Sequence, residues 1–311
     1  MTAPTAPLHV CTLFEGSYHL GLGALVNSLV ARGYRGPVWA GYRGPLPPWA
    51  RTDAIGPGHA RMAVGAGLSI EFIQLDTPVH FTNYKPDFML EVLRRAPEAG
   101  GVVYIDPDIV LKCVWAFVET WTTLGIALCE DVNSPMAARH PIRLLWRRFF
   151  EARGQGEAAE LDAYFNGGFV GVRRERAAFL DEWRAILAQV GAEIGGLTRL
   201  KVGDPAHPFD TPDQDALNVA AMYTRQPLST LGRAGMDFIP GGWTMAHAIG
   251  RPKPWEKNLV WQALRGRRPS SADRQYYSNI AAPIALYSRF GIARRRAGLL
   301  IAAALGRYLG S

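Results

Sequence analysis

The sequence of 311 residues has few cysteines, no long apolar run and no secretion signal at its start. Its three cysteines, Cys11, Cys113 and Cys129, are scattered without a CxxC pair, which predicts reduced, buried thiols and excludes a disulfide framework or a cysteine zinc site. No apolar run approaches the roughly 20 residues of a membrane-spanning helix. The first residues, MTAPTAPLHV, show neither the basic start nor the apolar core of a signal peptide. We therefore expect a cytoplasmic protein.

Most of the chain also has no surplus of basic over acidic residues. The net charge is +7, but residues 265–311 hold nine arginines, no lysine and a single acid, so they carry +8 and residues 1–264 sum to about −1. A nucleic-acid binder usually has a basic face on its folded body, and we therefore expect no nucleic-acid partner. The charge predicts a folded domain over residues 1–264 and a basic C-terminal tail over 265–311.

What the sequence does have is enough apolar residues for a full core, since 48% are hydrophobic. Their order predicts an α/β fold, of mixed and mainly parallel sheet flanked by helices. Residues 44–67, rich in Pro, Gly and Ala, are expected to be mostly loop. Strands are expected at 8–14, 37–42, 69–75, 101–106, within 121–131 and at 169–174. Helices are expected after residue 19 up to Gly33, at 85–99 and at 175–190.

Two aspartates follow a predicted buried strand in YIDPDIVLK, residues 104–112. Carboxylates at the carboxyl end of a parallel strand point to where α/β sheets bind their ligands. Asp106 and Asp108 offer two hard oxygen donors there, which suit Mg²⁺ or Mn²⁺ with phosphate completing the shell. The alternative is a plain turn, because Asp-Pro-Asp is also good turn chemistry.

A second candidate site is HAIGRPKPW, residues 247–255. The imidazole of His247 can ligate a metal, Gly250 allows close backbone approach, and Lys253 supplies a positive charge for phosphate. The alternative is a polar surface loop with an incidental histidine.

Two further segments carry polar residues next to predicted regular structure. YFNGGFVGVRR (164–174) places Asn166 and two glycines before a strand, and its alternative is a tight turn. TPDQDALNVA (211–220) starts a helix for which Thr211 is the expected N-cap. The acids beside Gln214 also complement a helix dipole, so one or two of them have a structural explanation.

In this order, the segments resemble glycosyltransferase family 8, the retaining glycosyltransferases of GT-A fold, over about residues 8 to 258. HAIGRPKPW matches every fixed position of the family's HxxGxxKPW motif. The resemblance implies that residues 1–264 are a GT-A catalytic domain. It implies transfer of a hexose, with retention, from a nucleotide diphosphate sugar, with UDP favoured, to a hydroxyl of a glycan, a lipid-linked sugar or a small molecule.

The resemblance also implies roles for individual residues. The ligands of Mn²⁺ (or Mg²⁺), which bridges the donor diphosphate, correspond to Asp106, Asp108 and His247. Contacts with the nucleotide correspond to Thr12, Glu15, Tyr18, Lys85, Gly250 and Lys253, with Glu15 standing where the family usually has aspartate. Contacts with the sugar and the acceptor correspond to Asp213, Gln214, Asn166 and Asp131.

Two other functions remain open from the residues alone. A sugar-phosphate nucleotidyltransferase could use the same sheet and acids, although LFEGSYHLGLG lacks the basic residue expected of its phosphate loop. The second of these functions is that of a catalytically silent module that binds nucleotide sugars. The intact set of metal-ligating residues counts against it.

For the basic tail we expect binding to an anionic membrane surface, at the inner face of the membrane. The apolar run AGLLIAAALG, residues 297–306, lies between Arg296 and Arg307 and is too short to span a bilayer. Tyr287, Phe290 and Tyr308 are expected at the level of the headgroups. The alternative is a C-terminal helix packed on the folded domain, with its arginines in solvent.

Overall fold

A computed structural model of the chain describes residues 6–65, 67–156 and 158–309. It divides the chain into two compact units, which are described separately. The first unit comprises Met1–Leu13, Leu75–Ile105 and Phe117–Arg233, and the second comprises Phe14–Gln74, Asp106–Ala116 and Ala234–Ser311. The predicted boundary between residues 264 and 265 does not coincide with the boundaries of these two units, and the predicted domains stay a prediction.

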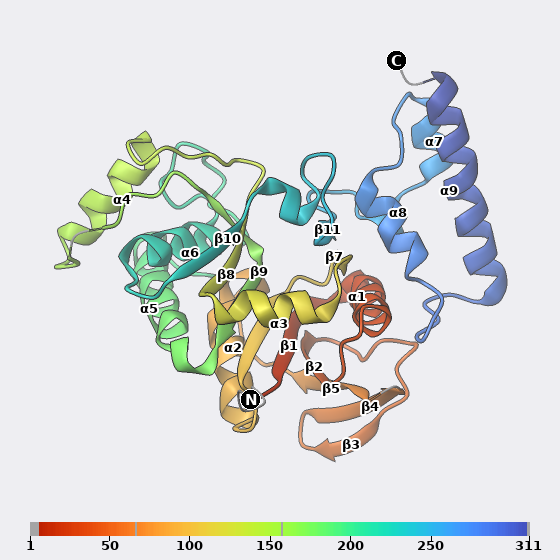
Figure 1. The fold of residues 1–311 in the computed structure, drawn as a ribbon, viewed down its shortest axis with the longest axis horizontal. Helices are drawn as coiled ribbons and strands as arrows, with labels where there is room; N and C mark the ends of the chain where they lie inside the picture. The colour runs from red at the N-terminus through yellow and green to blue at the C-terminus, as the bar shows by residue number, and fades with distance from the viewer. Residues whose placement is uncertain (1–5, 66, 157, 310–311) are drawn as a thin grey trace. The chain divides into compact units, whose positions relative to one another are not determined.

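The first unit is built on a sheet with the strand order β10-β8-β9-β6-β1 (Figure 1). The strands are β1 (Leu8–Glu15), β6 (Gly101–Ile105), β8 (Ile126–Glu130), β9 (Phe165–Arg173) and β10 (Leu228–Leu231). β9 pairs antiparallel with both neighbours, whereas β1 with β6 and β8 with β10 are parallel pairs. Every residue of β6 and β9 is buried. β6 is an apolar run, and the two polar side chains of β9, Asn166 and Arg173, are hydrogen-bonded.

Helices flank this sheet. They are α2 (Lys85–Arg95), α3 (Trp115–Thr123), α4 (Pro141–Glu151), α5 (Ala178–Glu193) and α6 (Pro212–Tyr223), with short 3₁₀ turns at Phe81–Tyr84 and Arg174–Arg176. α2 packs on β6 and on α5, and α6 packs on α5 and on β9. Trp121 of α3 stacks on Phe169 of β9 with ring centroids 4.9 Å apart. These contacts fix the start of α6 against the start of β9, where the polar residues of this unit gather.

The second unit contains a sheet segment of order β2-β5-β4-β3 and a separate two-stranded sheet, β11-β7. The strands are β2 (Pro37–Arg43), β3 (Asp53–Gly56), β4 (His59–Gly65), β5 (Leu68–Gln74), β7 (Ile109–Leu111) and β11 (Met245–His247). The helices are α1 (His19–Ala31), α7 (Leu259–Leu264), α8 (Ser271–Ser278) and α9 (Arg289–Leu309), with 3₁₀ turns at Gly16–Tyr18, Arg233–Met236 and Pro254–Glu256. α1 packs on β7, and α9 packs on α7 and α8.

The predicted α/β class is confirmed: strands and helices alternate, the sheet is mixed and mainly parallel, and the chain ends in a helix. Cys11, Cys113 and Cys129 are buried and form no disulfide, as predicted. Within the described residues, no helix combines the length and the apolar character needed to cross a membrane.

Two predictions of local structure differ from the structure. Residues 44–52 are irregular, as predicted, but β3 and β4 then form a hairpin around Gly58, whose φ of +64° suits the turn. Every residue of the edge strand β3 is exposed and no residue of β4 is buried, so neither strand is the apolar run that would predict it from the sequence. The helix predicted over 85–99 ends at Arg95, because Pro97 disfavours helical backbone at Ala96.

Candidate functional site

The DPD turn is held in place by β7, β11 and α1, all within the second unit. In the antiparallel β7–β11 pair Ile109 lies opposite His247, and the N–H of Ala248 donates to the carbonyl of Asp108 over 3.0 Å. On the helix side, a Cβ added to Gly21 would lie 2.3 Å from the carbonyl oxygen of Pro107, so α1 approaches the turn as closely as a glycine allows. The register of two short strands thus brings residues about 140 positions apart together.

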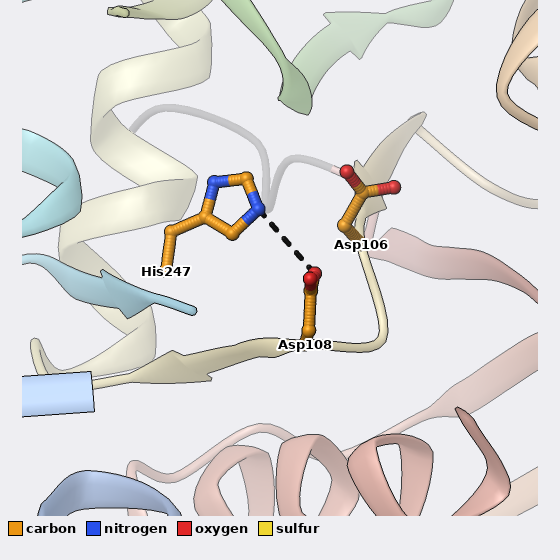
Figure 2. A group of neighbouring side chains, drawn as sticks. All are labelled: Asp106, Asp108 and His247. Carbon is orange, nitrogen blue, oxygen red and sulfur yellow. Dashed lines mark ion pairs between the residues drawn. The ribbon is translucent and has the colours of Figure 1, made fainter. Parts of the chain in front are cut away.

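Asp106, Asp108 and His247 form a cluster with the geometry of a cation site. One ligand atom from each of the three lies within 4.8 Å of the others (Figure 2). Nε2 of His247 is 3.3 Å from Oδ1 of Asp108. Nδ1 of the same ring is buried and has no hydrogen-bond partner among the described residues. The imidazole is therefore oriented by Asp108 and by the ring of Phe238, whose centroid lies 5.8 Å away.

This donor set fits Mn²⁺ and, with one nitrogen ligand, less closely Mg²⁺. Carboxylate oxygens are typical ligands of both ions, and imidazole is a ligand of transition metals. Three protein ligands leave the remaining positions of a six-coordinate ion to water or phosphate oxygens. The cluster could thus hold a divalent cation together with an anionic ligand.

Lys253 adds a buried positive charge to the cluster. Its Nζ donates to Oδ2 of Asp108 over 2.5 Å and to the carbonyl of Ala248 over 2.6 Å. Although burial raises the pKa of Asp108, the neighbouring His247 and Lys253 lower it well below its ordinary value. Burial lowers the pKa of Lys253, but Asp108 outweighs this and raises it. Both groups therefore stay charged at neutral pH.

The loop before Lys253 depends on Gly250. Its φ of +71° lies in the left-handed region, and an added Cβ would meet no atom within 4 Å. The glycine is therefore needed for backbone conformation and not for space. Its neighbours Ile249 and Arg251 are exposed.

The predicted nucleotide contacts from the start of the chain have different surroundings. The ring centroid of Tyr18 lies 5.7 Å from Nζ of Lys253, and burial raises the pKa of its hydroxyl. Glu15 forms an ion pair with Arg43 over 3.2 Å. Thr12 belongs to the first unit, where its buried hydroxyl has no hydrogen-bond partner among the described residues. Of the three, Tyr18 is the one that the structure places beside Lys253.

A second polar group lies in the first unit, around Gly167. Nζ of Lys85 donates to the carbonyl of Gly167 over 2.9 Å and to Oδ2 of Asp213 over 3.0 Å. The N–H of Gly167 donates to Oε1 of Gln214 over 3.1 Å. A Cβ at Gly167 would lie 3.1 Å from the Asp213 carboxylate, so the glycine lets the start of α6 approach β9. Lys85 and Asp213 are both buried.

The neighbouring residue, Asn166, connects this group to the end of β8. Its amide donates to Oδ2 of Asp131 over 2.6 Å, and its Oδ1 accepts from the N–H of Gly168 over 2.8 Å. The other carboxylate oxygen of Asp131 accepts from the backbone and the side chain of Asn133. Each side-chain polar atom of Asp131 and Asn166 therefore makes at least one hydrogen bond, which fixes both side chains.

The side chain of Thr211 was expected to cap the start of α6, and the structure shows a different arrangement. Thr211 is the N-cap residue, but its side chain makes no capping hydrogen bond. Instead, the carboxylate of Asp215 accepts from the N–H of Thr211 over 2.8 Å and from the hydroxyl of Tyr164 over 2.7 Å. Burial raises the pKa of Asp215 to about 7. Asp213 and Asp215, two residues apart, thus have different partners and different environments.

Sequence reasoning missed three residues that hold this group together. They are Tyr164 and Asp215, which bond to each other, and Asn218, which exchanges hydrogen bonds with both backbone groups of Phe165. The sequence contains part of the signal: DQDALN predicts a helix start at which Asp215 complements the dipole, but it does not predict the partners of Asp215 or of Asn218. Tyr164 carried no signal of its own.

The structure therefore gathers the predicted residues into two groups. Asp106, Asp108, His247, Lys253 and Tyr18 lie together in the second unit, and Lys85, Asp131, Asn166, Asp213 and Gln214 form a connected network in the first. The functional roles assigned to them stay predictions.

No family model and no curated protein sequence matches the chain. Its structure is similar to the apo structure of WbbM, a bifunctional glycosyltransferase, with a TM-score of 0.52 and 15% sequence identity. The match covers 93% of this chain and 52% of the other, so the chain spans about half the length of that protein. At this identity the likeness shows the fold, and with it the predicted GT-A type of α/β fold is confirmed.

Proposed function

We propose that the chain is a metal-dependent glycosyltransferase that moves a sugar from a nucleotide diphosphate sugar to a hydroxyl acceptor. The observation that supports this best is the cluster of Asp106, Asp108, His247 and Lys253, since it combines cation ligands with a buried ammonium. The shared fold with a glycosyltransferase supports it as well. We further propose membership of glycosyltransferase family 8 from HAIGRPKPW, with a UDP-linked hexose as donor.

The second-unit residues would bind the diphosphate. Asp106, Asp108 and His247 would hold Mn²⁺ or Mg²⁺, and the bound ion would neutralise the charge that develops on the leaving phosphate oxygens. Lys253 has three donor hydrogens, of which Asp108 and the carbonyl of Ala248 occupy two. Its third donor remains for a phosphate oxygen. Tyr18 would lie beside the nucleotide, and Glu15, Thr12 and Gly250 would complete its contacts.

The first-unit residues would act on the sugars. Asp213 and Gln214 would stabilise the cationic sugar carbon, Asn166 would contact the donor sugar, and Asp131 would face the acceptor. Lys85 donates to Asp213 and to the carbonyl of Gly167, which supports a positioning role that fixes the Asp213 carboxylate. In this proposal the leaving phosphate would accept the proton of the acceptor hydroxyl, so transfer with retention would need no free strong base in this network.

The acceptor would be a glycan, a lipid-linked sugar or a small molecule. We also propose that residues 265–311 hold the enzyme at an anionic membrane surface, on the inner face. Two features support this: the charge of +8 in this segment, and the exposed apolar side chains of α9, among them Phe290, Leu300 and Ile301. α9 packs on α7 and α8 with its opposite side, so packing and surface binding are compatible.

The test is an incubation of the protein and a hydroxyl acceptor library with Mn²⁺ and a panel of nucleotide sugars. We expect release of the nucleoside diphosphate with one donor, and NMR of the product should show the anomeric configuration of the donor. Release of pyrophosphate from a sugar phosphate and a nucleoside triphosphate would instead show a nucleotidyltransferase. Tight donor binding without turnover would show a binding module, and an inverted product would contradict the family assignment.

A further inference from the structure

The second unit contains a cavity of about 360 Å³ that no part of the proposed reaction uses. Its lining comes from the segment that follows Lys253 and from α7, α8 and α9. The residues that matter here are Trp255, Lys257, Tyr277, Arg294, Arg295 and Gly298. Since a water molecule occupies roughly 30 Å³, the space is sufficient for a phosphate group with its glycerol.

The charged groups around this cavity leave an excess of positive charge. Lys257 is neutralised by Asp273 of α8, with 2.8 Å between Nζ and Oδ1. Arg295 stacks on the ring of Tyr287 at 3.7 Å from its centroid. Within the described part of the chain, neither Arg294 nor Arg295 has an acidic partner. Two consecutive arginines therefore border the cavity without an acidic partner, and guanidinium forks match phosphate oxygens.

An apolar stripe runs along the exposed side of α9, next to the cavity. Residues 290, 293, 297, 300, 301 and 304 are all exposed, and their steps of three and four residues place them on one side of the helix. The largest of them are Phe290, Leu300 and Ile301, with exposed fractions of 77%, 70% and 50%. Arg294, one turn before Gly298, lies at the border between this stripe and the cavity.

Further arginines follow the other border of the stripe. Arg289, Arg296 and Arg307 are separated by whole numbers of turns, so they share one side of α9. All three are exposed. The stripe is thus flanked by arginines along both borders, and charge complementarity points to an anionic lipid surface and away from an apolar protein partner. The side chain of Tyr308, predicted at headgroup level, lies outside the described residues.

From these observations we infer that the cavity binds the phosphate of an anionic lipid headgroup through Arg294 and Arg295, with the acyl chains along the apolar stripe of α9. This inference rests on the membrane role proposed above and adds a specific phosphate site to it. Attraction by surface charge alone depends on the number of positive charges, whereas a phosphate site depends on the fork of the guanidinium group. The two can therefore be separated without changing the net charge.

The experiment is sedimentation of the full-length protein with phosphatidylcholine vesicles that contain phosphatidylglycerol, at low salt. The variant Arg294→Lys/Arg295→Lys keeps the charge and removes both guanidinium forks. We expect its affinity to fall roughly fivefold or more, because charge-assisted bidentate bonds are lost. The matched control, Arg289→Lys/Arg307→Lys, lies on the same helix outside the cavity and should bind like wild type.

A second variant tests the cavity itself. Gly298→Leu fills the space without changing the charge, and it should also lose affinity for the vesicles while thermal unfolding shows that the fold is retained. If all three variants bind like wild type, the phosphate site is wrong and surface charge explains binding. If wild type does not sediment with anionic vesicles, the membrane role fails too, while the donor assay stays independent. Stabilisation by inorganic phosphate without sedimentation would identify free phosphate as the ligand and overturn the lipid assignment.

Discussion

Nζ of Lys253 lies 2.5 Å from Oδ2 of Asp108, and both side chains are more than nine-tenths buried. The other oxygen of the same carboxylate lies 3.3 Å from His247. One buried acid thus connects the ammonium to the candidate cation site. Such a pair is costly to break, because removing one partner leaves an uncompensated buried charge.

Lys253→Met should therefore destabilise the protein by about 3–5 kcal/mol when no divalent cation is present. Addition of Mn²⁺ should restore much of this loss, because the ion neutralises Asp108 in place of the ammonium. Thermal unfolding with and without Mn²⁺ measures both effects. Arg251→Met is the control, since Arg251 is 70% exposed and lies 3.6 Å from Glu256, and its effect should be small and independent of Mn²⁺. Loss of stability that Mn²⁺ cannot restore would argue against a shared cation site.

The buried pair of Lys85 and Asp213 gives a second stability prediction. Lys85→Met should cost about 3–5 kcal/mol, because the Asp213 carboxylate is left buried without its cation. The double variant Lys85→Met/Asp213→Asn should recover most of this, since no charge remains. Urea unfolding of wild type, of the single variants Lys85→Met and Asp213→Asn, and of the double variant gives the coupling energy of the pair directly. Additive effects would show that the pair contributes little.

For the chemistry, we predict that Gln214→Ala lowers kcat by about a hundredfold or more and leaves the affinity for UDP nearly unchanged. The reason is that Gln214 belongs to the network at the start of α6, whereas the cation ligands belong to the second unit. The measurement is steady-state kinetics combined with UDP titration. A variant with normal kcat and weakened UDP binding would place Gln214 at the nucleotide instead.

The raised pKa of Asp215 should make the stability of the protein depend on pH. Burial raises its pKa to about 7 in the folded protein, above the ordinary value of about 4 in the unfolded chain. The folded state therefore holds the proton more tightly, and this contribution to stability falls between about pH 4 and pH 7, by up to roughly 1.4 kcal/mol per pH unit. Asp215→Asn mimics the protonated acid, so its stability should depend less on pH over this interval. Parallel unfolding curves of both proteins from pH 5 to pH 8 test this, and identical pH slopes would refute it.

The elements that could be predicted are those that the local sequence determines. GVVYI and FVGV are apolar runs, and both lie in buried strands of the sheet. The β3–β4 hairpin has exposed strands and no such pattern. α4 was missed as well, in a region where no element was assigned, and its Trp146 and Phe150 are fully buried.

The candidate site was predictable as a set of residues and not as a set of contacts. The DxD and HxxGxxKPW patterns marked Asp108 and Lys253, but only the β7–β11 register shows that they bond to each other. Lys85 was expected to contact the donor, and its bond to Asp213, 128 residues away in the sequence, has no local signal. The role of Asp215 as the acceptor for Thr211 also depends on how α6 begins.

Calorimetry of UDP binding, with and without Mn²⁺, in wild type and in Asp108→Ala, tests the central claim most directly. We predict tight binding only for wild type with Mn²⁺, because in the proposed site the cation would join the carboxylates to the diphosphate and only three protein ligands would hold it. Lys253→Arg serves as a variant that keeps the positive charge, and it should retain Mn²⁺-dependent binding. Equal affinity for UDP in all four wild-type and Asp108→Ala titrations would contradict the assignment of Asp106, Asp108 and His247 as the cation site of a glycosyltransferase.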